Sequence, residues 1–180
     1  MAFSYKDINN KVKRNNGLVS ALNVVDKAIT YITVLFYVLL LVYGIYQGVE
    51  TKDFTLLYRS ILIPGISFAL VSYYRKRTNS PRPYQVYDFT PALNKDTLGK
   101  SFPSRHVFSI FMVAIAVGQV TTLGMIIIFI MGIMLATIRV LGGVHFIKDV
   151  VAGMLIALII GAITYGLFCG TLGLLVIPFN

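Results

Sequence analysis

The sequence predicts an all-α membrane protein, a polytopic transmembrane helical bundle of about five spans preceded by an N-terminal interfacial helix. Of its 180 residues, 57% are hydrophobic and 13% are charged, and the mean hydropathy is +0.78. A soluble domain has about 45–50% apolar and about 25% charged residues. The basic residues behind the net charge of +9 lie mainly in polar gaps between apolar runs. This placement favours membrane lipids over nucleic acid as partners.

The first half of the chain supplies two spans and one long polar loop. Segment 1–29 carries basic residues and apolar residues at helical spacing, so we expect an interfacial helix that leads into the first span. The spans are expected at about 30–48 and 55–74, because each run is long enough to cross a bilayer. The polar stretch 75–102 follows. A loop of this length between helices usually carries function.

The second half of the chain supplies three more spans. They are expected at about 104–120, 123–141 and 150–178. The last run exceeds the roughly 20 residues that a bilayer requires, and we interpret it as one long tilted helix. The whole chain, 1–180, is expected to form a single domain.

Five spans place three polar regions on one face of the membrane. These regions are the N-terminus, the 75–102 loop and the segment 139–149. The same face carries most of the lysines and arginines, and the positive-inside rule assigns such a face to the cytoplasm.

The segment 139–149 brings an arginine, a histidine and an aspartate close together. Asp149 follows His145 by four positions, so the two would lie on one helical face if this stretch opens the fifth helix. A carboxylate bonded to one ring nitrogen leaves the other nitrogen free to act as a nucleophile or a base. Arg139 beside an oriented imidazole indicates a bound anion. The alternative is a set of interfacial charges in which Asp149 caps a helix.

Two other fragments carry chemistry on the same face. Ser104 precedes an apolar run and is expected to be a helix N-cap, which would place His106 beside free backbone N–H groups that favour an anion. Arg75 and Arg82 bracket a polar loop, and their planar forks suit phosphate oxygens. The alternatives are a capped helix with an exposed histidine and a positively charged membrane flank.

In this order the fragments resemble the pattern of the type-2 phosphatidic acid phosphatase family. That pattern is Lys-x6-Arg-Pro, then Pro-Ser-Gly-His, then Ser-Arg-x5-His-x3-Asp. The chain has Arg75-x6-Arg82-Pro83, Pro103-Ser104-Arg105-His106 and Arg139-x5-His145-x3-Asp149, which together span residues 75–149. It departs from the pattern at Arg75, Arg105 and Ile138, where the family has Lys, Gly and Ser.

The resemblance implies a lipid phosphatase that needs no metal or other cofactor. His145, oriented by Asp149, would attack phosphorus to form a phosphohistidine, and His106 would protonate the leaving oxygen and then activate water. The resemblance also implies a multi-pass protein of a bacterial plasma membrane, although many relatives are expected to act on its outer face. The substrate would be phosphatidylglycerol phosphate, phosphatidic acid or an undecaprenyl phosphate or diphosphate. Its phosphate would be bound by Arg75, Arg82, Ser104, Arg105 and Arg139.

Three other functions fit parts of the sequence. His106, His145 and Asp149 could supply a three-ligand metal site of a membrane hydrolase, although the arginines would repel a dication. Ser104 could be the nucleophile of a Ser-His-Asp hydrolase. A non-catalytic anionic-lipid-binding protein or a small transporter would explain the cations and the spans, but not the spacing of His145 and Asp149.

Overall fold

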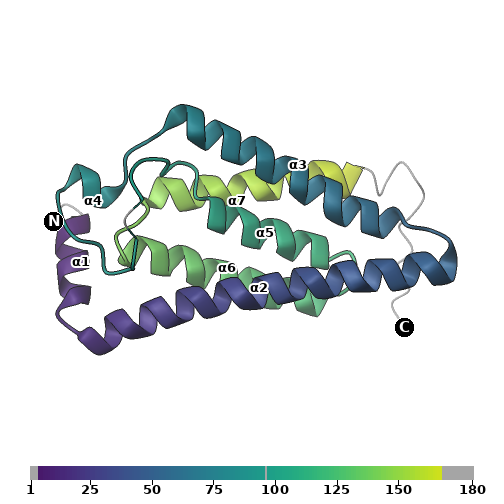
Figure 1. Cartoon of the computed structure of the whole chain (residues 1–180), viewed down its shortest axis with the longest axis horizontal. Helices are drawn as coiled ribbons and strands as arrows, with labels where there is room; N and C mark the ends of the chain where they lie inside the picture. The colour runs from purple at the N-terminus through teal and green to yellow at the C-terminus, as the bar shows by residue number, and fades with distance from the viewer. Residues whose placement is uncertain (1–3, 96, 168–180) are drawn as a thin grey trace.

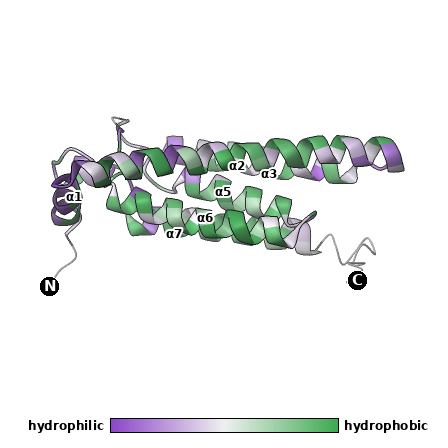
Figure 2. Cartoon of the chain, turned by 90° about the horizontal axis from the view of Figure 1, so that it is seen from below, coloured by the Kyte–Doolittle hydropathy of each residue, from purple (hydrophilic) through white to green (hydrophobic). Residues whose placement is uncertain are grey.

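The computed structural model describes residues 4–95 and 97–167, and it is an all-helical bundle in two layers (Figures 1 and 2). The long helices α2 (Asn16–Thr51) and α3 (Thr55–Thr78) form an antiparallel hairpin in one layer. Apolar residues cover the middle of the bundle, whereas polar residues gather around α1 and at the α2–α3 turn (Figure 2). This distribution is the one that a bilayer-spanning bundle requires.

The second layer consists of α5 (Arg105–Val117), α6 (Thr122–Leu141) and α7 (Ile147–Gly161), which the π-helix η1 (Ala162–Leu167) continues. Helix α5 is central and contacts α2, α3, α6 and α7. It therefore contributes more side chains to the core than any other helix, and Phe111 is completely buried.

The fold confirms the predicted polytopic bundle, with one difference in the spans. Four helical stretches are long and apolar enough to cross a membrane, and they include α2, α3, α6 and α7 with its continuation to Gly166. The helix expected at 104–120 has only 13 residues and is therefore about 20 Å long. That length falls short of the roughly 30 Å hydrocarbon core. The end of the last predicted span, beyond residue 167, lies outside the described residues.

The N-terminal segment differs from the predicted interfacial lead over 1–29. A short helix, α1 (Tyr5–Lys13), is followed by a break, and α2 begins at Asn16 and continues into the first span. The break lies at Asn15, whose side chain accepts the N–H of Leu18 at 3.0 Å and caps α2. No second capping break interrupts α2 between that cap and Thr51.

The 75–102 loop is partly helical. Helix α3 extends to Thr78, and the single turn α4 (Pro83–Val86) begins with a proline, which suits the first helical position. Gln85 Oε1 accepts the N–H groups of Arg82 at 3.0 Å and Gly99 at 2.8 Å. The loop is therefore folded on itself.

The loop, α1 and the turn before α7 gather at one end of the bundle (Figure 1). The N–H of Ala92 donates to the carbonyl of Gly142 at 3.1 Å, and the N–H of Asn94 donates to Asn23 Oδ1 of α2 at 2.9 Å. The polar regions that the topology predicted on one face therefore do lie together.

Candidate active site

The turn between α6 and α7 places His145 in the interior of the polar end. Gly143 adopts a φ of +75°, a left-handed conformation that glycine adopts without strain, and the chain reverses there. The side chain of His145 is 1% exposed, and its Nδ1 lies 3.4 Å from Asp149 Oδ2. The predicted contact between these residues is therefore present, although His145 lies in the turn just before α7 rather than on the helix.

Asp149 both caps α7 and orients the histidine. Its Oδ2 accepts the N–H of Phe146 at 2.9 Å and the hydroxyl of Ser101 at 2.5 Å. A carboxylate only accepts hydrogen bonds, so a bond with His145 requires the proton on Nδ1. The Nε2 atom of His145 then keeps its lone pair.

Ser104 lies where α5 approaches α7. It occupies the N-cap position as predicted, but its side chain makes no capping bond. Its N–H donates to the carbonyl of Asp149 at 2.8 Å. The approach depends on Gly153, because a Cβ there would lie 2.6 Å from the Ser104 carbonyl oxygen. Ser104 Oγ is buried and has no hydrogen-bond partner among the described residues.

Three buried arginines act on the pair, Arg82 and Arg139 on His145 and Arg75 on Asp149. Their exposed fractions are 7% for Arg75, 3% for Arg82 and 4% for Arg139. Arg82 is held in place, because Nε donates to the carbonyl of Gly99 at 3.1 Å and Nη1 donates to that of Val144 at 3.0 Å. This clamp fixes the loop beside His145.

The other two arginines each keep an unused donor. Arg75 Nη2 donates to the carbonyl of Lys100, and Arg139 Nη2 donates to Asp26 Oδ2 at 3.0 Å. Within the described part of the chain, Arg75 Nη1 and Arg139 Nε are buried without a partner. Buried polar atoms are normally paired. These two donors are therefore available to a ligand that carries acceptor atoms.

The surroundings of His145 keep its ring neutral at pH 7. Burial lowers the pKa of His145, whereas the hydrogen bond to Asp149 raises it, and the charges of Arg82 and Arg139 lower it further. Burial disfavours the charged imidazolium. A neutral ring with a free Nε2 is the form that can attack an electrophile.

Arg105 and His106 lie in the first turn of α5 but in different surroundings. Arg105 is exposed, and its guanidinium lies 5.1 Å from the ring centroid of Phe68 in α3. His106 is half-buried and interacts electrostatically with His145 and Arg139. The structure thus groups His106 with the buried site, while Arg105 lies at its margin.

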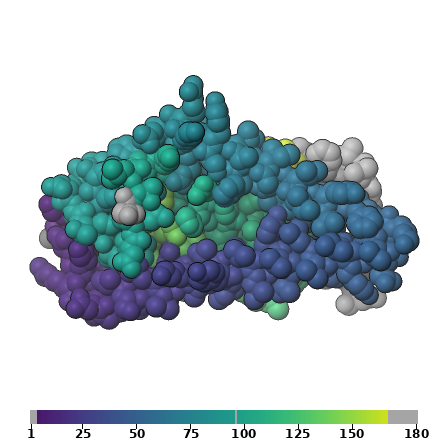
Figure 3. Space-filling model, in the orientation of Figure 1, coloured from purple at the N-terminus to yellow at the C-terminus, as the bar shows by residue number. Residues whose placement is uncertain are grey.

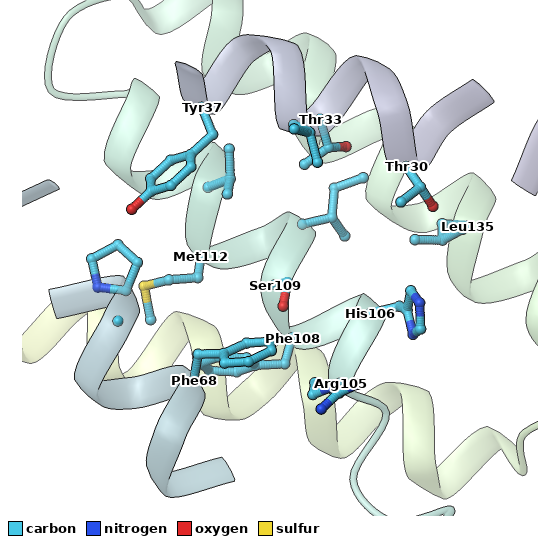
Figure 4. Close-up of a pocket in the computed structure, with 15 residues that line it drawn as sticks. Thr30, Thr33, Tyr37, Phe68, Arg105, His106, Phe108, Ser109, Met112 and Leu135 are labelled. Atoms are coloured by element: carbon cyan, nitrogen blue, oxygen red, sulfur yellow. The ribbon is translucent and has the colours of Figure 1, made fainter. Parts of the chain in front are cut away.

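An apolar pocket of about 440 Å³ begins at this turn and runs between α2, α3 and α5. Figure 3 shows it as a hollow whose floor is α5. His106 lies at one end and Tyr37 at the other (Figure 4). A second pocket of about 220 Å³ is more polar, and His106 and Thr30 line both pockets.

Sequence reasoning missed two residues that position this site. Ser101 bonds Asp149 and lies 3.4 Å from His145 Nδ1, but it belongs to none of the three fragments and carries no sequence signal. Asp26 forms an ion pair with Arg139. An acidic residue within an apolar helical segment was the available signal for Asp26.

The other chemistries considered from the sequence find less support. Among the described residues, no group of three His, Cys, Asp or Glu side chains is arranged to hold a metal ion. Ser104 Oγ has no partner in this same part of the chain, so it is not bonded to a histidine as in a serine-hydrolase triad.

Comparisons with known proteins find solved structures with a similar fold. A crystal structure of Aquifex aeolicus LpxE is 24% identical, with a TM-score of 0.65, and covers 90% of this chain and 92% of that one. A transmembrane PAP2-type phosphatidylglycerolphosphate phosphatase from Bacillus subtilis is 19% identical, with a TM-score of 0.51 and 93% coverage of both chains. No curated protein sequence matches. The PAP2 superfamily model matches residues 54–169, and the chain therefore belongs to the PAP2 superfamily.

Proposed function

We propose that the protein is a membrane phosphatase that removes the terminal phosphate from a lipid phosphate monoester or diphosphate. The observation that carries this proposal is a set of three buried atoms near an oriented histidine that have no partner among the described residues, namely Arg75 Nη1, Arg139 Nε and Ser104 Oγ. Arginine forks and hydroxyls are suited to phosphate oxygens. A phosphoryl group bound here would give all three atoms a partner.

The names of the structural relatives support the same class of substrate. The Bacillus subtilis protein is described as a phosphatidylglycerolphosphate phosphatase. Phosphatidylglycerol phosphate, phosphatidic acid and undecaprenyl phosphates or diphosphates all combine a phosphate with a hydrocarbon tail. Both relatives come from bacteria, and we propose the bacterial plasma membrane as the location.

The geometry supports a reaction in two steps. In the first step, His145 Nε2 attacks the terminal phosphorus, an N–P bond forms, and the P–O bond to the leaving group breaks. His106 gives the leaving oxygen a proton that it takes up together with the anionic substrate, because burial and the charge of Arg139 lower the pKa of His106 before the substrate binds. In the second step, His106 takes a proton from water, whose oxygen attacks phosphorus and breaks the N–P bond. Inorganic phosphate is released, and both histidines return to their starting forms.

Buried positive charge would stabilise the transferring group without a metal. Arg75, Arg82 and Arg139 are all at most 7% exposed, and charge acts strongly where water is excluded. Arg82 would contribute mainly its charge, because two of its nitrogens are already bonded to carbonyls. The same charges would repel a divalent cation from this position.

The apolar pocket would hold the tail of the lipid. It is lined mainly by apolar side chains of α2, α3 and α5, including Val34, Phe68 and Met112 (Figure 4). His106 at its end would then meet the oxygen that joins the tail to the phosphate. Burial of hydrocarbon in such a pocket is favourable.

A phosphate-release assay on the purified full-length protein in detergent tests the proposal. We expect turnover of at least one of phosphatidic acid, phosphatidylglycerol phosphate and farnesyl diphosphate, and turnover should persist with a strong chelator. His145→Asn should abolish release while the protein still folds and inserts. Lys76→Met is the matched control, because Lys76 is exposed on the same face. Binding of these lipids without any release would instead favour the anionic-lipid-binding alternative.

A further inference from the structure

The polar pocket of about 220 Å³ lies beside the site, and the proposed reaction does not yet use it. Its lining includes Asp26, Lys95, His106 and Arg139. The pocket therefore lies between α2, the 75–102 loop and two residues of the proposed phosphate site, His106 and Arg139.

The pocket has a fixed wall on the loop side. Asn23 of α2 donates from Nδ2 to the carbonyl of Ala92 at 3.0 Å, and its Oδ1 accepts the N–H of Asn94 at 2.9 Å. Ala92 is also bonded through its N–H to the carbonyl of Gly142 at 3.1 Å. These bonds fix the loop on α2 and on the turn before His145, and Lys95 follows directly.

The charges in the pocket favour an anion. Lys95 is half-buried and has no ion pair with any described carboxylate. Asp26 is paired with Arg139 at 3.0 Å, while Arg139 Nε remains buried without a partner among the described residues. Burial lowers the pKa of Lys95, and the charges of Arg139 and Arg82 lower it further, whereas Asp26 raises it. A second anion would offset this concentration of positive charge.

The position of His106 tells which part of a substrate would reach the pocket. His106 and Thr30 line both the apolar and the polar pocket. As the proposed donor to the leaving oxygen, His106 marks the side of the leaving group. A lipid can therefore place its hydrocarbon in the apolar pocket and a polar part of its leaving group against Lys95.

We infer that Lys95 binds a second phosphate carried by the leaving group, so that the preferred substrates are lipids with two phosphates. This inference rests on the proposed phosphatase function. Two lipid types share the chemistry, namely a diphosphate and a lipid whose terminal phosphate is joined through glycerol to a phosphodiester. In each, the N–P bond forms at the terminal phosphorus, its P–O bond breaks, and the leaving oxygen takes the proton of His106. Phosphatidic acid has an uncharged leaving group and would leave Lys95 unpaired.

Two matched pairs of substrates test the inference on the purified full-length protein. Farnesyl diphosphate is compared with farnesyl phosphate, and phosphatidylglycerol phosphate is compared with phosphatidic acid. The variant Lys95→Met removes the charge and keeps most of the side-chain length. Lys95→Arg keeps a cation, and Lys76→Met removes an exposed one.

We expect Lys95→Met to lower kcat/KM about tenfold for at least one substrate with two phosphates. For farnesyl phosphate and phosphatidic acid the change should stay within about twofold, and Lys95→Arg should restore most of the loss. The pair that shows the dependence on Lys95 identifies the lipid type. An equal loss on all four substrates, or no loss on any, would overturn the inference. Either result leaves the phosphatase proposal standing, because that depends only on turnover by the unaltered protein.

Discussion

Arg139 of α6 and Asp26 of α2 form a buried ion pair, in which Arg139 Nη2 lies 3.0 Å from both Oδ1 and Oδ2 of Asp26. Arg139 is 4% exposed and Asp26 is 18% exposed. The pair fixes one of the proposed phosphate-binding arginines from a helix that contains none of the family's motifs. Asp26 is therefore a positioning residue, and its loss should affect Arg139 rather than the histidines.

Replacing Asp26 with asparagine is expected to lower kcat/KM about tenfold. The substitution keeps one acceptor for Arg139 but removes the charge that pairs it, and an unpaired buried charge is costly. Because Asp26 holds Arg139 in position to bind the phosphate of the substrate, the loss should appear mainly as a higher KM. Steady-state kinetics of the variant check this expectation. Asp88→Asn, at an exposed position, should leave both constants unchanged, and an unchanged KM in Asp26→Asn would exclude the positioning role.

Replacing Ser101 with alanine is expected to lower kcat about tenfold with little change in KM. The hydroxyl donates to Asp149 Oδ2 at 2.5 Å, so its removal weakens the group that holds the tautomer of His145. Ser20→Ala, on the exposed side of α2, is the matched control. A loss confined to KM would instead place Ser101 in substrate binding.

The rate is expected to fall on the acidic side only well below the ordinary pKa of histidine, about 6.5. His145 must be neutral to attack, so activity is present above its pKa and disappears as the pH falls through it. Burial lowers the pKa of His145. The acidic limb of the pH profile, where activity is lost as the pH falls, therefore moves to lower pH. A profile of kcat/KM between about pH 4 and 8 measures it. A limb at or above about pH 6.5 would contradict a buried, neutral nucleophile.

Replacing Gly153 with alanine is expected to cost about 1–3 kcal/mol of stability and to reduce activity. The new Cβ would lie 2.6 Å from the backbone oxygen of Ser104, so α5 and α7 would have to separate at the site. Thermal unfolding in detergent, followed together with phosphate release, measures both effects. Gly166→Ala is the control, because a Cβ there has nothing within 4 Å. Equal effects of the two substitutions would mean that close packing at Gly153 does not matter.

The features predicted from the sequence are those that leave a local pattern. Apolar runs of bilayer length indicated α2, α3 and α6, and the four-residue spacing of His145 and Asp149 indicated their contact, now found at 3.4 Å. Contacts between residues that are distant in the sequence leave no such local pattern and could not be predicted in this way. Asp26 is 113 positions from Arg139, and only the packing of α2 on the second layer brings them together.

Two element boundaries differ from those that the sequence predicts, and both differences have physical causes. The N-terminal lead was expected to include residues up to 29, but the cap at Asn15 divides it there, and the rest of it continues α2. Helix α5 was expected to be a full span, but it begins at Arg105 and ends at Val117. The chain turns at Gly118, and Thr121, whose Oγ1 accepts the N–H of Gly124 at 3.3 Å, already caps α6.

Isolation of the phosphorylated protein would identify the residue that attacks phosphorus. The full-length protein would be mixed with a lipid phosphate labelled in its terminal phosphate, quenched rapidly in alkali and digested. Phosphohistidine withstands alkali, and the account predicts label on the peptide that contains His145, with none in His145→Asn and full labelling in Lys76→Met. Label on Ser104, or phosphate release by His145→Asn at the rate of the unaltered protein, would contradict the assignment of His145 as the nucleophile.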